Sequence, residues 1–111
     1  MFQPTIMLVA GTRPELIKLA PVTQELADRP HRVQLALTGQ HAELDPAAYG
    51  LGAARLLRLS CPAGKDPRHH SDLVAAALQP SLTGSDRPDL VVVQGDTSSA
   101  LGGALGARAA G

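Results

Sequence analysis

Two short polar segments carry residue types that bind anions or move protons, and each follows an apolar run. The first is Gly11–Glu15 (GTRPE), which follows TIMLVA, and the second is Gly95–Thr97 (GDT), which follows LVVVQ. An arginine at the start of a helix is unfavourable unless an anion binds there, because the helix dipole and the free N–H groups attract negative charge. A carboxylate at a similar place can act as a general acid or base. The two segments therefore indicate a site for an anionic ligand.

The first segment predicts a helix that begins at Pro14, with Arg13 extended just before it. Proline disfavours helical geometry in the preceding residue and is itself favoured at the first helical position. Thr12 and Glu15 have the T-x-x-E spacing of a capping box. Arg13 is then either a surface arginine beside an ordinary cap or an anion-binding group. Lys18, one turn further along, either faces the same crevice or is solvated.

Asp96 in the second segment also has two interpretations. An aspartate between a strand and a helix commonly caps the helix by accepting hydrogen bonds from backbone N–H groups. A catalytic aspartate would need a raised pKa or a basic partner. The hydroxyls of Thr97, Ser98 and Ser99 follow directly and are candidates for phosphate binding together with the helix N-terminus.

A third polar segment, Gln40–His41, ends the run RVQLALT. His41, Glu43 and Asp45 do not have the spacing of a metal site, so we predict no bound metal. The chain has neither the G-x-x-x-x-G-K-[ST] loop nor the G-x-G-x-x-G fingerprint of nucleotide-binding proteins. A nucleotide site would have to be built from Arg13 and helix ends.

Two further features carry weaker signals. His69 and His70 stand just before a predicted helix and are expected to be solvated. Cys61 lacks a basic neighbour that would favour its thiolate. As the single cysteine, it excludes an internal disulfide and suits a reducing compartment.

Hydrophobic periodicity predicts the elements that must position these groups. The predicted strands are 5–10, 32–38, 55–59 and 90–93, and the predicted helices are 14–29, 71–82 and 100–110, with one helical turn at 46–49. This alternation predicts an α/β fold, a Rossmann-like parallel sheet with helices on both faces. Ligands of such sheets bind beyond the carboxyl ends of the strands. Glycines in the last helix are expected to allow close approach to a neighbouring backbone.

Length and composition restrict the class of protein. The 111 residues suffice for one small domain, and 44% of them are hydrophobic. Ten basic and ten acidic residues balance, which argues against nucleic-acid or membrane-surface partners. The absence of a long apolar run or a signal peptide predicts a cytoplasmic protein. Because a doubly wound sheet usually continues beyond such a last helix, we expect the chain to be part of a larger domain.

Taken together, three stretches resemble the start of the bacterial UDP-N-acetylglucosamine 2-epimerases of the non-hydrolysing type. They are VAGTRPELIKLAP, ALTGQH and PDLVVVQGDTSSALGGALGA, in this order and spacing. The resemblance runs from about Ile6 to Arg108 and is weaker between Ala42 and Asp86. It implies a B-type glycosyltransferase-like fold of two Rossmann-like domains, with this chain as part of the N-terminal domain and the second domain absent.

The resemblance also implies an activity and roles for particular residues. The family interconverts UDP-GlcNAc and UDP-ManNAc by eliminating and re-adding UDP, as a homodimer without metal or other cofactor. By position, Asp96 resembles a carboxylate important for catalysis, Arg13 the nucleotide-binding arginine and Lys18 its support. Gln40 and His41 match a segment that, in some members, contacts a second UDP-GlcNAc as activator.

Two alternatives to this function stay open. One is the hydrolysing epimerase, which releases free ManNAc, although the motif TGQH favours the non-hydrolysing branch. The other is an inactive nucleotide-binding fragment. An active enzyme of this family would supply ManNAc for surface polysaccharide.

Overall fold

The computed structural model describes residues 3–29, 31–41, 44–52 and 54–111, and shows there a four-stranded parallel sheet in the order β3-β2-β1-β4. The strands are β1 (Thr5–Ala10), β2 (Arg32–Leu37), β3 (Arg55–Arg58) and β4 (Leu90–Val92). The helices are α1 (Arg13–Ala27), α2 (Pro67–Thr83) and α3 (Ser98–Ala110), with a short 3₁₀ helix η1 (Pro46–Tyr49). The predicted α/β class is confirmed. None of the described helices is both long and apolar enough to cross a bilayer.

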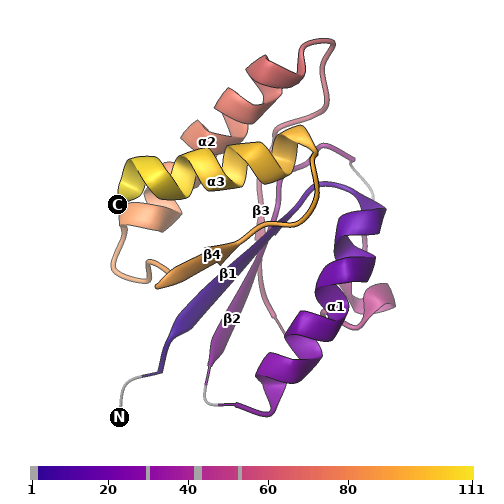
Figure 1. Cartoon of the computed structure of the whole chain (residues 1–111), viewed down its shortest axis with the longest axis vertical. Helices are drawn as coiled ribbons and strands as arrows, with labels where there is room; N and C mark the ends of the chain where they lie inside the picture. The colour runs from indigo at the N-terminus through magenta and orange to yellow at the C-terminus, as the bar shows by residue number, and fades with distance from the viewer. Residues whose placement is uncertain (1–2, 30, 42–43, 53) are drawn as a thin grey trace.

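The helices cover both faces of the sheet. Figure 1 shows α1 on one face, and α2 and α3 packed against each other on the opposite face. Because the strands are parallel, all their carboxyl ends lie at one edge, which we call the carboxyl edge. The polar segments that follow β1, β2 and β4 therefore meet there.

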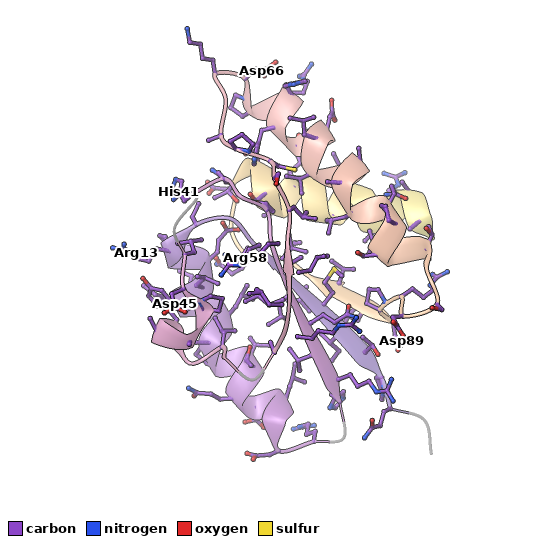
Figure 2. The ribbon with its side chains drawn as sticks, turned by 180° about the vertical axis from the view of Figure 1, so that it is seen from behind. Arg13, His41, Asp45, Arg58, Asp66 and Asp89 are labelled. Atoms are coloured by element: carbon purple, nitrogen blue, oxygen red, sulfur yellow. The ribbon has the colours of Figure 1, made fainter. Side chains whose placement is uncertain are left out.

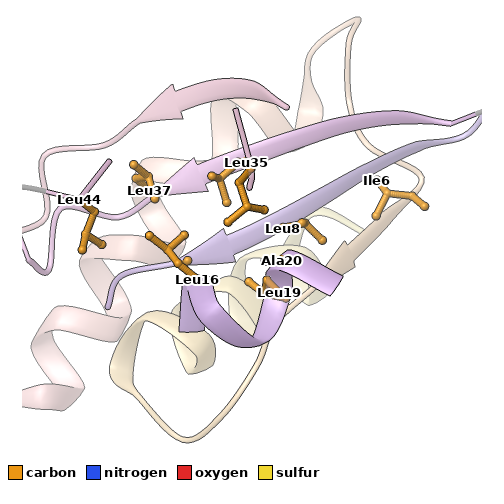
Figure 3. Packing of buried hydrophobic residues seen from close by; sticks show 10 residues of the cluster. Ile6, Leu8, Leu16, Leu19, Ala20, Leu35, Leu37 and Leu44 are labelled. Atoms are coloured by element: carbon orange, nitrogen blue, oxygen red, sulfur yellow. The ribbon is translucent and has the colours of Figure 1, made fainter. Parts of the chain in front are cut away.

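The face under α1 is packed with large aliphatic side chains, shown in Figure 3. Ile6 and Leu8 of β1 point to this face, since alternate residues of a strand share a side. Leu16 and Leu19 of α1 meet them at helical spacing, and all four are at most 7% exposed. This packing fixes α1, and with it the Gly11–Glu15 segment, against the sheet.

On the opposite face of the sheet, α3 packs closely against its neighbours, and the residues at the closest contacts are small. Met7 and Val9 of β1 lie on this side with Val74 of α2. A Cβ on Gly102 would come within 2.6 Å of the Val74 Cβ and 2.7 Å of the Ser71 carbonyl oxygen. The expected close approach to a neighbouring backbone is confirmed for Gly102, because only a residue without a side chain fits here.

Helix α2 begins four residues earlier than expected, at Pro67 instead of Ser71. The Asp66 side chain accepts a hydrogen bond from the Arg68 N–H at 3.0 Å and caps the helix, with proline at the first helical position. The expectation that His70 is solvated is wrong, because this earlier start places it inside the first turns of α2 with only 2% of its surface exposed.

Helix α1 begins one residue earlier than expected. Thr12, with φ −134° and ψ 162°, is the extended residue, and Arg13 is the first helical residue. Pro14 takes the second helical position, where its missing N–H needs no partner. Arg13 therefore belongs to the helix instead of standing before it.

Candidate functional site

The three polar segments of the carboxyl edge are joined by side-chain hydrogen bonds. The Thr97 hydroxyl donates to Glu15 Oε2 at 3.1 Å, which links the segments after β4 and β1. The Ser99 hydroxyl donates to Gln40 Oε1 at 2.6 Å, which links the segments after β4 and β2. Side-chain hydrogen bonds thus join residues that are far apart in the sequence.

Glu15, which accepts the first of these bonds, is a buried carboxylate with 2% of its surface exposed. Its Oε1 accepts hydrogen bonds from the Gly11 N–H at 3.1 Å and the Thr12 hydroxyl at 2.8 Å. The expected capping box is therefore not formed, because the Thr12 hydroxyl donates to Glu15 and does not cap the helix, while Glu15 accepts the N–H of Gly11 and not that of Thr12. With the bond from Thr97, Glu15 joins the starts of α1 and α3.

Thr38, Gln40 and Ser99 form a closed ring of hydrogen bonds. Because the Ser99 hydroxyl donates its hydrogen bond to Gln40 Oε1, the Thr38 hydroxyl is the donor in its contact with Ser99 Oγ at 2.7 Å. Thr38 Oγ1 in turn accepts the Gln40 N–H at 3.3 Å. A Cβ on Gly11 would lie 2.5 Å from Thr38 Oγ1 and 2.9 Å from Gln40 Oε1, so the ring requires glycine there.

The middle hydroxyl of the run, that of Ser98, contacts His70. Its Oγ lies 2.6 Å from His70 Nδ1, while His70 Nε2 lies 2.7 Å from the Cys61 carbonyl oxygen. The hydroxyls of Thr97, Ser98 and Ser99 thus all have protein partners. The structure does not support their interpretation as phosphate ligands.

Asp96 is exposed, and it does not cap α3. Thr97 is the N-cap, since its Oγ1 accepts the Ala100 N–H at 3.2 Å. Gly95 has a φ of +86°, a conformation that favours glycine and turns the chain just before Asp96. Among the described residues, Asp96 has no hydrogen-bond or ion-pair partner. Its carboxylate is therefore available to a ligand, and the capping interpretation is wrong.

Arg13 and His41 lie on the same side of the carboxyl edge, as Figure 2 shows. Together with Pro14 and Leu44 they line an open depression of about 370 Å³, and both side chains are exposed. A guanidinium on the first turn of a helix, beside an imidazole, favours an anionic ligand. Lys18 is exposed on α1 but does not line this depression.

Cys61 and Asp45 do not contribute to the candidate site. Burial raises the pKa of the Cys61 thiol, so this cysteine is a poor nucleophile. The Asp45 carboxylate accepts the Ala47 N–H at 3.1 Å and caps η1. Glu43 lies outside the described residues. Within them, no three His, Cys, Asp or Glu side chains gather as metal ligands, and the absence of a metal stays a prediction.

A second hollow of about 290 Å³ lies between β2, β3 and the end of α2, and Gln34, Arg55 and Asp86 are among its lining residues. Arg55 and Asp86 form an exposed ion pair across it, with 3.6 Å between nitrogen and oxygen. Exposed pairs of this kind contribute little to stability. None of the residues predicted for a site lines this hollow.

The residue that sequence reasoning missed most clearly is His70, and a signal for it was present. Asp66 followed by proline is typical of a helix start. From such a start, His70, Val74 and Leu78 recur every four residues and share one face of α2, which is buried. That spacing would have placed His70 in the core.

No protein-family model matches the chain. It is 33% identical over 106 residues to the UDP-N-acetylglucosamine 2-epimerase of Escherichia coli, and 32% identical over 104 residues to that of Methanococcus maripaludis. Both matches cover 92% of this chain but 28% of the relative, so the chain spans less than a third of these proteins.

A solved structure agrees with the sequence matches. The UDP-GlcNAc 2-epimerase of Methanocaldococcus jannaschii, in complex with UDP-GlcNAc and UDP, superposes with a TM-score of 0.79 at 30% identity. The match covers 97% of this chain and 30% of that one. These neighbours have a B-type glycosyltransferase-like fold, which confirms the expected fold.

Proposed function

Because this chain is homologous, over 92% of its length, to part of the UDP-N-acetylglucosamine 2-epimerases, we propose that it forms the part of such an enzyme that holds UDP and contributes one catalytic carboxylate. The observation that carries the proposal is the exposed Arg13 on the first turn of α1, in an open depression at the carboxyl edge. Diphosphate is the anionic part of a nucleotide sugar, and arginine binds phosphate oxygens in a bidentate manner.

The reaction we propose has two stages. In elimination, the C2 proton is removed, the C1–O bond breaks, and UDP leaves with the bonding electrons to give 2-acetamidoglucal. In re-addition, C2 takes a proton on its opposite face and a UDP oxygen bonds again to C1. Asp96 moves the proton or orients the group that does, because its carboxylate is exposed and unpartnered within the described residues.

The enzyme requires more than this chain in our proposal. The sugar lies between two domains, so we expect residues 1–111 alone to bind UDP without epimerising UDP-GlcNAc. We propose a cytoplasmic, homodimeric parent enzyme of the non-hydrolysing type that supplies ManNAc for surface polysaccharide. The hydrolysing alternative would release free ManNAc, which NMR distinguishes from UDP-ManNAc.

Titration of this chain with UDP, followed by NMR or calorimetry, tests the proposal. Arg13→Ala removes a charge-assisted contact worth roughly 1.5–3 kcal/mol, so UDP should bind about 10- to 100-fold more weakly. Arg29→Ala is the matched control, because Arg29 lies beyond the other end of α1 and, among the residues that the structure describes, forms an ion pair with the exposed Glu25 alone. Failure of the unsubstituted chain to bind UDP, or an equal loss in both variants, would contradict the proposal.

A further inference from the structure

His70 is a buried histidine that the proposed reaction does not use. Its ring lies between the connection from β3 to α2, which contributes the Cys61 carbonyl, and the first residue of α3, Ser98. Only 2% of the residue is exposed. A polar ring buried this deeply is stable only when both of its nitrogens have partners, as they do here.

The two hydrogen bonds of His70 assign its tautomer. A carbonyl oxygen only accepts, so Nε2 carries a proton and donates to Cys61 O at 2.7 Å. In the neutral ring, Nδ1 is then an acceptor, and the Ser98 hydroxyl donates a hydrogen bond to it at 2.6 Å. The Cys61 carbonyl is itself held in place, because the Cys61 N–H donates to the Thr38 carbonyl at 2.9 Å.

The Ser98 bond bears on the segment that carries Asp96. Gly95 makes a turn at positive φ before Asp96, and Thr97 behind it is tied to Glu15. Ser98 is the next anchor, and its partner lies on α2 instead of α1. The peptide around Asp96 is therefore held from two different helices.

We propose that His70 is a positioning residue: by accepting the Ser98 hydroxyl, it fixes the start of α3 so that the Asp96 carboxylate stays exposed at the carboxyl edge. The part of Asp96 in binding or catalysis rests on the proposed function. The mechanical link between His70 and Asp96 does not, because it follows from the hydrogen bonds alone.

Two substitutions of His70 separate its two hydrogen bonds. The amide of His70→Asn reaches the position of Nδ1 and keeps the contact with Ser98. The amide of His70→Gln reaches the position of Nε2 and keeps the contact with Cys61. Both remove one buried hydrogen bond, so thermal melts should show similar losses of stability.

NMR of the whole chain gives the decisive measurement. The imidazole nitrogen shifts should show the Nε2-protonated tautomer. In His70→Gln, amide shifts at Asp96 and Thr97 should change and amide exchange there should rise about fivefold, while His70→Asn should stay near the unsubstituted chain. Equal changes in both variants, no change in either, or the Nδ1-protonated tautomer would overturn the proposal.

Two further variants keep the test decisive if a His70 variant does not fold. Ser98→Ala removes the same hydrogen bond with little change in volume and should reproduce the His70→Gln shifts at Asp96. Ser60→Ala, at an exposed position, is the control and should leave them unchanged. UDP titration of the same samples is a separate readout, since absence of binding would overturn only the proposed function.

Discussion

The starts of α1 and α3 look alike in sequence but are held in different ways. Each follows a strand, contains a glycine and exposes one charged side chain, Arg13 in one and Asp96 in the other. The α1 start is held largely by local bonds, because Glu15 accepts from Gly11 and Thr12 within the same segment. The α3 start bonds mainly to residues at least 28 positions away in the sequence.

This difference determines which parts of the chain fix the position of each charged side chain. The position of Arg13 depends on its own segment and on the packing of α1. The position of Asp96 depends on Glu15, His70 and Gln40, which belong to three other segments. Substitutions at a distance should therefore disturb Asp96 more than Arg13.

The largest expected effect is a loss of turnover on substitution of Asp96, and it distinguishes the proposed role of Asp96 from that of Arg13. In a chimera with this chain in place of the matching segment of a relative, Asp96→Asn should lower kcat about 100-fold, the usual worth of a general acid or base. UDP affinity should change little, because the proposed function assigns the diphosphate contact to Arg13 and not to Asp96. Steady-state kinetics and UDP titration check both values, and near-normal turnover would remove Asp96 from the reaction.

Gly11→Ala should disturb both starts at once. The added Cβ would overlap Ser99 Oγ and crowd Thr38 and Gln40, so the hydrogen-bond ring must open. We expect a loss of roughly 2–3 kcal/mol in the free energy of unfolding, measured by urea denaturation. Gly64→Ala, where a Cβ meets nothing within 4 Å, is the control and should be near neutral.

Glu15→Gln should weaken the bridge between the two starts. The amide keeps the shape but removes the charge that strengthens three hydrogen bonds, so unfolding free energy should fall by about 1–2 kcal/mol. The same substitution at Glu25, which is 73% exposed in its side chain, should cost less than about 0.5 kcal/mol. Equal losses would show that the bridge is unimportant.

Thr97→Val and Thr12→Val compare the two starts directly. Thr97→Val removes the cap of α3 and the bond to Glu15, at a cost of about 1 kcal/mol, and should shift amide resonances in both segments. Thr12→Val removes only a local bond and should shift the first segment alone. Heteronuclear NMR would contradict the comparison if the changes in amide resonances extended equally far in both variants.

The smallest expected effect is a change in stability at alkaline pH that comes from Cys61, a residue outside both helix starts. Burial raises the pKa of the thiol above its ordinary value of 9.0, so the unfolded chain loses this proton at lower pH than the folded chain. This contribution to stability is complete below pH 9.0 and falls as pH rises above it. The stability difference between the chain and Cys61→Ala should therefore shrink at alkaline pH, as measured by urea denaturation.

The elements were largely predictable because their signals are local. The run TIMLVA predicted β1 within its observed bounds, and the four-residue turn at 46–49 was found as expected. The start of α2 differs from the expected one because the stretch before Ser71, with two prolines and several charges, has the composition of a connection between elements. The proline that suggested a loop is in fact the first residue of the helix.

The candidate site was predictable only in outline. Exposed Arg13 and Asp96 follow from their places after strands, which the sequence contains. The bond between Glu15 and Thr97 joins residues 82 positions apart, and no local pattern specifies it. The same holds for Ser98 and His70, because their contact needs the packing of α2 on α3.

The run of Thr97, Ser98 and Ser99 has a consequence for how mutations accumulate in this chain. Three neighbouring hydroxyls look redundant, as if one could replace another after a loss. In the fold each one bonds to a different partner, on α1, on α2 or after β2. A substitution at one of these positions is therefore not compensated by the neighbouring hydroxyls, and we expect each of the three to tolerate substitution poorly despite their shared chemistry.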